Sequence, residues 1–308
     1  MKRFSKITTT QLARICGVSQ GTVDRALHDR GGISPETKEK ILSVAREYDY
    51  IPNISVGKDG NSMLIGVVLY DLYNEYFSKL AMSFVNVAKT MGYSVIFLFS
   101  DKELERERSA IDYFNYIGVD GIVLFSVGSD DEEYINYLKS LTKPIAVIGN
   151  RLKDMTYIGI DDCQAMYDLT ARFLNDVKHG EIAYFAPALR KKLSRENAQS
   201  LRLQGFKMAM EESRRSYRIA MSEDELSAAS AGILCPTDHY VLRALTRYGT
   251  DTPKRLAGFD NTSVLRRLKP KLLTVEYSTD AIATECLNYI LGRKYKKDIP
   301  HSVVYNVE

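Results

Sequence analysis

From residue 63 onward, apolar runs of strand length alternate with amphipathic stretches of helical length. The first four apolar runs lie at residues 63–70, 94–99, 121–125 and 144–148. Strands and helices that alternate in this way form parallel sheets with helices on both faces. The alternation begins again at residue 163 and continues to residue 291, so the sequence predicts two doubly wound lobes. Such sheets bind ligands beyond the carboxyl ends of their strands, which predicts a site in the cleft between the lobes.

The composition excludes several classes of protein. The chain has 308 residues, of which 45% are hydrophobic; this suits about two globular units and excludes a wholly disordered chain. No apolar run approaches the roughly 20 residues that a helix needs to cross a bilayer. The basic N-terminus continues into three threonines at residues 8–10 rather than into an apolar stretch. We therefore expect no secretory signal and no membrane partner.

Motifs for metal binding and catalysis are missing from the sequence. Its four cysteines form neither a CxxC pair nor a zinc spacing: Cys16, Cys163, Cys235 and Cys286. This usage favours a cytoplasmic protein with no structural metal and no cofactor. The sequence has no GxGxxG after a strand, no GxxxxGK[ST], and no Ser/His/Asp or paired-carboxylate pattern. No catalytic residue is assigned, and we do not expect an enzyme.

Residues 8–50 have the pattern of three short helices. Gly17 can take the positive φ that ends the first helix, and Ser19 is placed to cap the second, over residues 20–27. Ser34-Pro35 is a strong start for the third. A helix, a tight turn and a second helix at this spacing are typical of a helix-turn-helix, whose second helix enters the DNA major groove. A purely structural pair of helices would show the same pattern.

The charge distribution favours the DNA-binding interpretation. The formal net charge is +3. The first 60 residues hold ten Lys and Arg against seven Asp and Glu and account for all of this excess. A local positive field of this kind suits contact with phosphates.

The N-terminal residues resemble the DNA-binding domain of the lactose-repressor (LacI) family. The resemblance rests on residues 17–27, 33–38 and 45–53. Shorter stretches, in the same order, resemble the periplasmic-binding-protein-like effector domain of that family; they lie at residues 65–69, 119–124, 144–151, 202–206, 258–261 and 273–275. The family consists of dimeric or tetrameric transcription factors that sense small molecules, usually sugars.

The resemblance implies a domain order. A small all-α helix-turn-helix domain would span residues 1–53, followed by a linker over 54–62 and an α/β effector domain over 63–308. Lobe 1 of the effector domain would comprise about 63–161 plus 278–292, and lobe 2 about 162–277 plus 299–308.

The linker departs from the family. Members that kink DNA have a short hinge helix whose Leu wedges into the minor groove. This linker lacks the Ala-Arg pair of that helix, and Asp59 stands where the Leu would be. We therefore expect no recognisable hinge helix: either the DNA is bent less, or Ile54 or Val56 replaces the Leu.

The resemblance assigns six DNA contacts. Base-reading positions are Gln20, Gly21 and Arg25, and phosphate contacts are Thr8, Ser19 and Thr22. Gln suits adenine and Arg suits guanine. Asp24 stands where the family commonly has Ser, and it would repel phosphate unless Arg25 or Arg14 neutralises it. The residues alone leave open a surface role for Gln20 and a salt bridge for Arg25.

The resemblance also implies seven ligand contacts in the cleft: Asn74, Phe77, Arg151, Arg202, Asp238, Asp260 and Tyr277. Guanidinium groups that face carboxylates would orient a polyol, because each hydroxyl can both donate and accept. The residues alone leave alternatives: a rim salt bridge for Arg151 or Arg202, a helix cap for Asp260 and a core position for Phe77.

Together these features predict a ligand-responsive regulator of transcription, a repressor that senses a small polar metabolite, most simply a sugar. It would bind operator DNA of two-fold symmetry as a homodimer. In an alternative, the cleft has lost small-molecule binding and responds to a protein partner. That alternative rests on Thr237 and Asp162, where the family has Asn, and on a short segment over residues 217–235.

Overall fold

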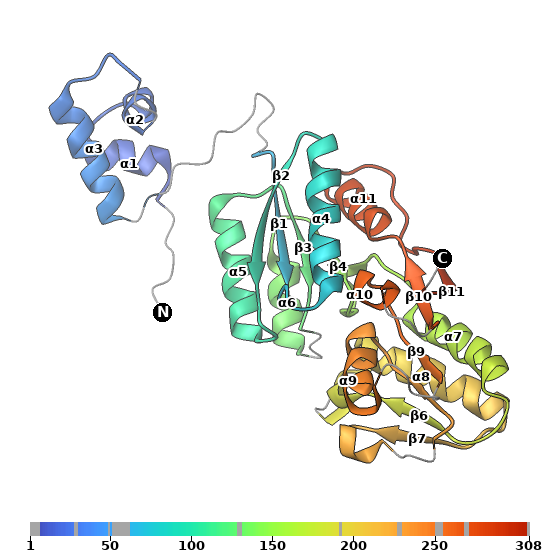
Figure 1. Ribbon diagram of the computed structural model, residues 1–308. Helices are drawn as coiled ribbons and strands as arrows, with labels where there is room; N and C mark the ends of the chain where they lie inside the picture. The colour runs from blue at the N-terminus through green and yellow to red at the C-terminus, as the bar shows by residue number, and fades with distance from the viewer. Residues whose placement is uncertain are drawn as a thin grey trace.

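The computed structural model describes residues 7–27, 30–48, 50, 62–127, 131–190, 193–226, 230–249, 255–267 and 271–306. Three helices form an N-terminal unit (Figure 1): α1 (Thr9–Cys16), α2 (Gln20–Leu27) and α3 (Pro35–Glu47). Its core has its own buried side chains, namely Leu12, Ala13, Cys16, Val23, Ala26, Ile41 and Ala45. The predicted helix-turn-helix unit is confirmed.

Local signals set the ends of these helices. Thr8 accepts from the Gln11 amide at 3.2 Å, and the Gln11 side chain accepts from the Thr8 amide at 2.8 Å, so the two form a capping box. Gly17 ends α1 with φ 68°, in the left-handed region that glycine adopts without strain. The Ser34 hydroxyl accepts from the Thr37 amide at 3.2 Å, ahead of Pro35 at the first turn of α3.

Lobe 1 is built on a parallel five-stranded sheet in the order β2-β1-β3-β4-β5. Its strands are β1 (Leu64–Leu69), β2 (Ser94–Phe99), β3 (Gly121–Phe125), β4 (Ile145–Ile148) and β5 (Thr156–Tyr157). Its helices are α4 (Glu75–Thr90), α5 (Leu104–Ile117), α6 (Glu132–Ser140) and α11 (Thr279–Ile290). Alternate residues of β1 pack on opposite faces, with Val67 toward α4 and α11 and Val68 toward α5 and α6. The sheet is therefore doubly wound, as predicted.

Lobe 2 has a six-stranded sheet in the order β11-β10-β9-β8-β6-β7. Its strands are β6 (Ile182–Phe185), β7 (Tyr217–Ala220), β8 (Gly232–Leu234), β9 (Arg255–Ala257), β10 (Leu273–Tyr277) and β11 (His301–Tyr305). Its helices are α7 (Asp162–Asp176), α8 (Ala198–Glu212), α9 (Asp238–Tyr248), α10 (Ser263–Arg266) and the 3₁₀ turns η1 (Pro187–Arg190) and η2 (Glu223–Glu225). A parallel sheet was predicted, but the edge strand β11 runs antiparallel to β10, so the sheet is mixed.

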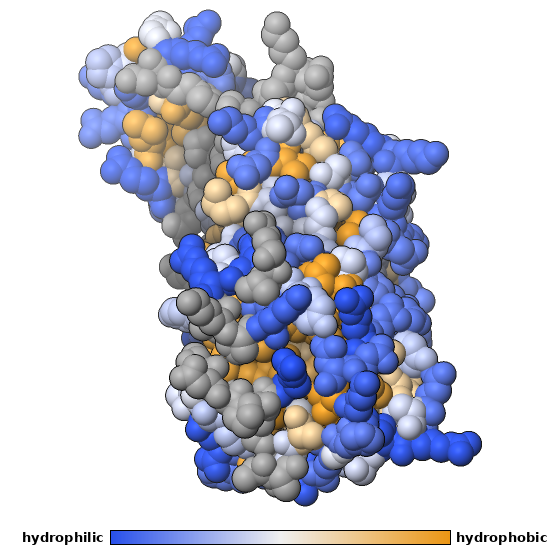
Figure 2. Space-filling model, turned by 45° about the vertical axis from the view of Figure 1, so that its right-hand side comes forward, coloured by the Kyte–Doolittle hydropathy of each residue, from blue (hydrophilic) through white to orange (hydrophobic). Residues whose placement is uncertain are grey.

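The chain passes between the lobes three times, after β5, after β10 and after α11. Two of these crossings are tied together: the Gly159 amide donates to the Lys297 carbonyl at 3.0 Å, and the Ile299 amide donates to the Gly159 carbonyl at 2.8 Å. No described helix is long and apolar enough to span a bilayer. The face shown in Figure 2 is mainly hydrophilic, with apolar side chains among the charged ones, as on many globular proteins.

A glycine allows α7 and α8 to pack closely in lobe 2. A Cβ at Gly205 would lie 2.0 Å from the Cys163 carbonyl oxygen and 3.0 Å from the Tyr167 amide nitrogen. We expect Gly205→Ala to push the two helices apart and to lower the free energy of unfolding by about 1–3 kcal/mol, measured by urea titration with circular dichroism. Gly31→Ala is the control, because a Cβ there meets no atom of the described structure within 4 Å. Equal stability of the two variants would contradict this packing.

Candidate functional site

Five of the six predicted DNA contacts lie at the N-termini of α1 and α2, and the sixth, Arg25, lies in the last turn of α2. Thr8 and Ser19 cap the two helices; the Ser19 hydroxyl accepts from the Thr22 amide at 3.1 Å. The Gln20 side chain donates to the Thr10 hydroxyl and links the start of α2 to α1. Unpaired amides at a helix start attract anions, so two adjacent starts suit a phosphate backbone.

Charged groups on α2 are partly paired. The Arg25 side chain is exposed on the outer face of the helix, as a base-reading residue needs to be. Asp24 pairs with Arg30 at 3.1 Å, whereas Arg25 or Arg14 was the expected partner. The Arg30 pair lowers the repulsion that Asp24 exerts on a nearby phosphate. The linker residues 54–61 lie outside the described residues, so the expectation about the hinge helix is not tested.

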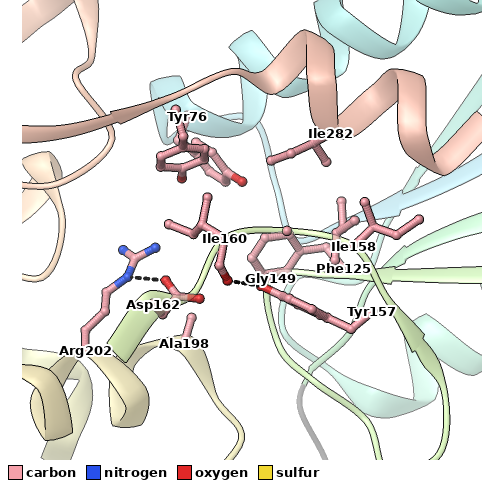
Figure 3. A pocket seen from close by; sticks show the side chains of 13 residues that line it. Tyr76, Phe125, Gly149, Tyr157, Ile158, Ile160, Asp162, Ala198, Arg202 and Ile282 are labelled. Atoms are coloured by element: carbon pink, nitrogen blue, oxygen red, sulfur yellow. Dashed lines mark hydrogen bonds and ion pairs between the residues drawn. The ribbon is translucent and has the colours of Figure 1, made fainter. Parts of the chain in front are cut away.

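Between the lobes lies a cavity of about 30 Å³, which has room for about two water molecules (Figure 3). Both lobes and the crossings contribute to its wall, through Tyr76, Phe125, Ile148, Gly149, Tyr157, Ile158, Gly159, Ile160, Asp162, Ala198, Arg202, Tyr277 and Ile282. The wall is mostly aromatic and aliphatic, with one polar corner where Arg202 meets Asp162 (Figure 3). A lining of this kind, with few polar groups, is typical of small-molecule sites.

Arg202 is the centre of the polar corner. Its Nε donates to Asp162 Oδ1 at 2.7 Å and its Nη1 donates to the Pro236 carbonyl at 2.6 Å. Asp260 Oδ1 lies 3.8 Å from Nη1 and accepts from the Tyr277 hydroxyl at 2.9 Å. The guanidinium also stacks 3.6 Å from the centre of the Phe259 ring. Several independent contacts therefore fix the position of this arginine.

Burial and charge oppose each other in this cluster. Burial raises the pKa of Asp162, although the Arg202 charge partly offsets it. Burial likewise raises the pKa of Asp260 to about 6, against the pull of Arg202. For Arg202, burial lowers the pKa, but the two carboxylates more than offset burial and the pKa is raised. Arg202 is charged at every physiological pH, while Asp260 is close to titration.

Three of the seven predicted ligand residues meet at this corner. Arg202 and Tyr277 line the cavity. Asp260 contacts both of these side chains but does not itself line the cavity. Arg151 lies beside the cavity, with its guanidinium 4.9 Å from the Tyr157 ring centre. Its Nε is buried and has no hydrogen-bond partner among the described residues.

The structure places the side chains of the other three predicted residues away from the cavity wall. Asn74 caps α4 by accepting from the Tyr76 amide at 3.1 Å. Phe77 is buried in the core, edge-on to Phe125 at 4.9 Å between ring centres. Asp238 is fully buried at the start of α9. The structure thus favours the core alternative for Phe77.

Sequence reasoning did not assign several residues that line the cavity. Tyr76 faces it in place of Phe77, and Phe125 reaches it from the end of β3. Asp162 supplies the main carboxylate partner of Arg202. Phe125 could have been found from its position, because ligands bind beyond the carboxyl ends of parallel strands.

The buried Asp238 is expected to make stability depend on pH. Its carboxylate accepts from the Thr262 amide at 2.7 Å, the Thr262 hydroxyl at 3.0 Å and the Thr274 hydroxyl at 3.2 Å. Burial, and next the nearby charge of Asp260, raise the pKa of Asp238 to about 8. The folded protein therefore holds this proton more tightly than the unfolded chain, and stability falls as pH rises from about 4 to about 8.

Asp238→Asn is expected to reduce the loss of stability between about pH 4 and about pH 8, because the amide does not ionise. Asp260 titrates near pH 6, so the interval between pH 6 and pH 8 isolates Asp238. The free energy of unfolding, measured with urea at both pH values, should fall less in Asp238→Asn than in the wild type. Asp224→Asn, at an exposed position, is the control. An equal fall in all three proteins would show that Asp238 does not carry this proton.

Two family descriptions match the chain. "Bacterial regulatory proteins, lacI family" matches residues 9–53. "Periplasmic binding proteins and sugar binding domain of LacI family" matches residues 62–233, which is more than half of the chain.

Similar proteins match over nearly the full length. Catabolite control protein A of Priestia megaterium is 26% identical over 94% of this chain and 93% of its own. The ribose operon repressor of Halalkalibacterium halodurans is 26% identical over 96% of this chain and 95% of its own. The solved transcriptional regulator CelR–cellobiose complex, 20% identical, has the same fold with a TM-score of 0.63 and covers 98% of this chain and 99% of its own. The chain therefore belongs to the LacI family of bacterial regulatory proteins, which are DNA-binding regulators of transcription and not enzymes.

Proposed function

We propose that this protein is a cytoplasmic repressor that binds operator DNA as a homodimer and senses a small sugar between its lobes. Gln20 and Arg25, with the close approach that Gly21 allows, would read bases. Thr8, Ser19 and Thr22 would contact phosphates. The exposed positions of Gln20 at the start of α2 and of Arg25 in its last turn support this assignment, as does the exposure of Thr8 and Ser19 at the two helix starts.

The polar corner of the cavity carries the sugar proposal. Arg202 offers donors and Asp162 offers acceptors at the cavity wall, while Asp260 positions Arg202, so a hydroxyl that donates and accepts is satisfied there. The rings of Tyr76 and Tyr277 provide flat apolar walls. The names of the similar proteins, a ribose operon repressor and a regulator bound to cellobiose, agree with a sugar. No observation favours the alternative of a protein partner in the cleft.

The small cavity also supports a mechanism. Pockets that hold small molecules have volumes of roughly 300–1,000 Å³, so a cavity of about 30 Å³ must enlarge before a sugar enters. The lobes would part and close again around the ligand. In a dimer, this movement of the lobes would change the spacing of the two DNA-binding units.

A thermal-shift screen tests the sugar proposal. Pentoses, hexoses and disaccharides are added in turn, and one class should raise the melting temperature; a ligand at 100 times its Kd stabilises by about 2.7 kcal/mol. Asp260→Asn is the matched control, because it keeps the size of the side chain but loses its charge, and it should reduce that shift. If no sugar raises the melting temperature of the wild type, the sugar proposal fails.

A further inference from the structure

A carboxylate of lobe 1 contacts the backbone of lobe 2 at the edge of the cleft. Glu75 is the first residue of α4, at the carboxyl end of β1. Its Oε1 accepts from the Ser263 amide at 2.6 Å, and its Oε2 accepts from the Val264 amide at 3.1 Å. These two amides begin α10, which lies beside the start of α4 (Figure 1). Each carboxylate oxygen thus holds one amide of the opposite lobe.

The two amides need a partner from outside their own lobe. Thr262 stands at the N-cap of α10, where a threonine hydroxyl commonly accepts from the helix amides. Here that hydroxyl donates to Asp238 at 3.0 Å and makes no cap bond within α10. Glu75 fills the same role from the other lobe. Burial raises its pKa, but the hydrogen bonds from Ser263 and Val264, with a smaller effect of the Arg266 charge, outweigh burial and lower the pKa, which favours the ionised form. Bonds from amides to a charged acceptor are the stronger kind.

A second contact joins the lobes beside the cavity. Asn150 follows β4 and is held in lobe 1, where its amide donates to the Ser126 carbonyl at 2.7 Å. Its Oδ1 accepts from the amide of Ala198, the first residue of α8 in lobe 2, at 3.0 Å. The lobes cannot separate without breaking this bond and both bonds of Glu75.

We propose that Glu75 is a clasp that holds the two lobes closed and sets how often the cleft opens. Glu75 does not line the cavity, so it acts on ligand affinity through the position of lobe 2 rather than by contact. For a ligand that binds only the closed form, the apparent Kd equals the intrinsic Kd divided by the fraction of protein that is closed, so more opening means weaker binding. Loss of the clasp should raise the open-to-closed ratio about tenfold. This corresponds to the low end of the range for a single hydrogen bond to a charged group, because water competes for the partly exposed carboxylate and amides.

The test uses the amide of Ala198 as a reporter of opening. Its only bond in the described structure crosses the cleft to Asn150, and it is far in sequence from Glu75. Hydrogen exchange is followed by NMR on the full-length protein labelled with ¹⁵N-alanine, without any sugar. In Glu75→Ala the Ala198 amide should exchange about tenfold faster than in the wild type. Glu75→Gln keeps one acceptor oxygen and should give a smaller increase.

Two controls separate opening from unfolding. Ala183 lies in β6, which is paired on both sides with β7 and β8 in the lobe 2 sheet, and its amide should exchange at an unchanged rate. Glu132→Ala, at the exposed first residue of α6, should leave Ala198 unchanged. The clasp is refuted if Ala198 exchanges equally in Glu75→Ala and the wild type, or if Ala183 accelerates as much as Ala198. Because no effector is added, the result does not depend on the sugar screen.

Discussion

Arg25→Ala and Gln20→Ala are each expected to abolish much of the protein's preference for its operator over other DNA. A bidentate contact between such a side chain and a base contributes about 1–3 kcal/mol of discrimination. A homodimer makes the contact in both half-sites, so the loss is roughly 2–6 kcal/mol. Selection of bound duplexes from a random palindromic library gives the preferred sequence of the wild type. Gel shifts on that sequence and on a scrambled one then measure each variant.

The control distinguishes base reading from general attraction to phosphate. Arg46 is exposed on α3 and donates to the Leu42 carbonyl, so Arg46→Ala removes one positive charge from the same unit. This variant should bind both duplexes somewhat more weakly and keep the preference. Gln20 also has to exchange its bond to Thr10 for one to a base. If both α2 variants select the same sequence as the wild type, α2 does not read bases through these residues.

Arg202→Ala is expected to cost about 3–5 kcal/mol of unfolding free energy and to abolish sugar binding. Removal of one partner from a buried ion pair leaves an uncompensated charge, and here two carboxylates, Asp162 and Asp260, lose their cation. Arg202→Lys should be intermediate, because one ammonium cannot donate to Asp162 and to the Pro236 carbonyl in the same geometry. Urea unfolding at pH 7.5, followed by circular dichroism, measures the cost.

A surface pair in the same lobe provides the control. Arg218 pairs with Glu181 at 2.5 Å, with 45% of the arginine side chain exposed, and Arg218→Ala should cost less than about 1 kcal/mol. The cost of Arg202→Ala should also shrink as pH falls toward about 6, because Asp260 without the arginine charge takes up its proton at a higher pH than in the wild type. A cost no larger than that of Arg218→Ala would mean that the buried cluster does not depend on Arg202.

Local sequence signals predicted the N-terminal unit well. Gly17 ends α1 and Ser34-Pro35 begins α3 because caps and positive φ depend on neighbouring residues alone. Periodicity predicted the two sheets for the same reason, since the spacing of apolar residues reflects the element that buries them. A helix after Asp260 was expected, and α10 lies there, whereas β5 and β11 were not predicted. β5 has only two residues, which are too few to establish a period.

The site was predicted less completely than the fold. Sequence position indicated Arg202, Asp260 and Tyr277, which the structure brings together. It assigned Phe77 and not Tyr76 to the cavity. A rotation of about 100° per residue turns these neighbouring helix positions to different faces. Tyr76 faces the cavity, and Phe77 faces the core.

The sequence alone therefore determined most of the order of helices and strands, the helix-turn-helix unit and the family, because these depend on neighbouring residues and on motifs. Only the tertiary structure decided which carboxylates surround Arg202, that Asp238 is turned into the core, and that Glu75 meets the amides of Ser263 and Val264. Each of these contacts joins residues that are far apart in the chain. Their energies depend on distances of a few ångströms, which arise only when the two lobes pack together.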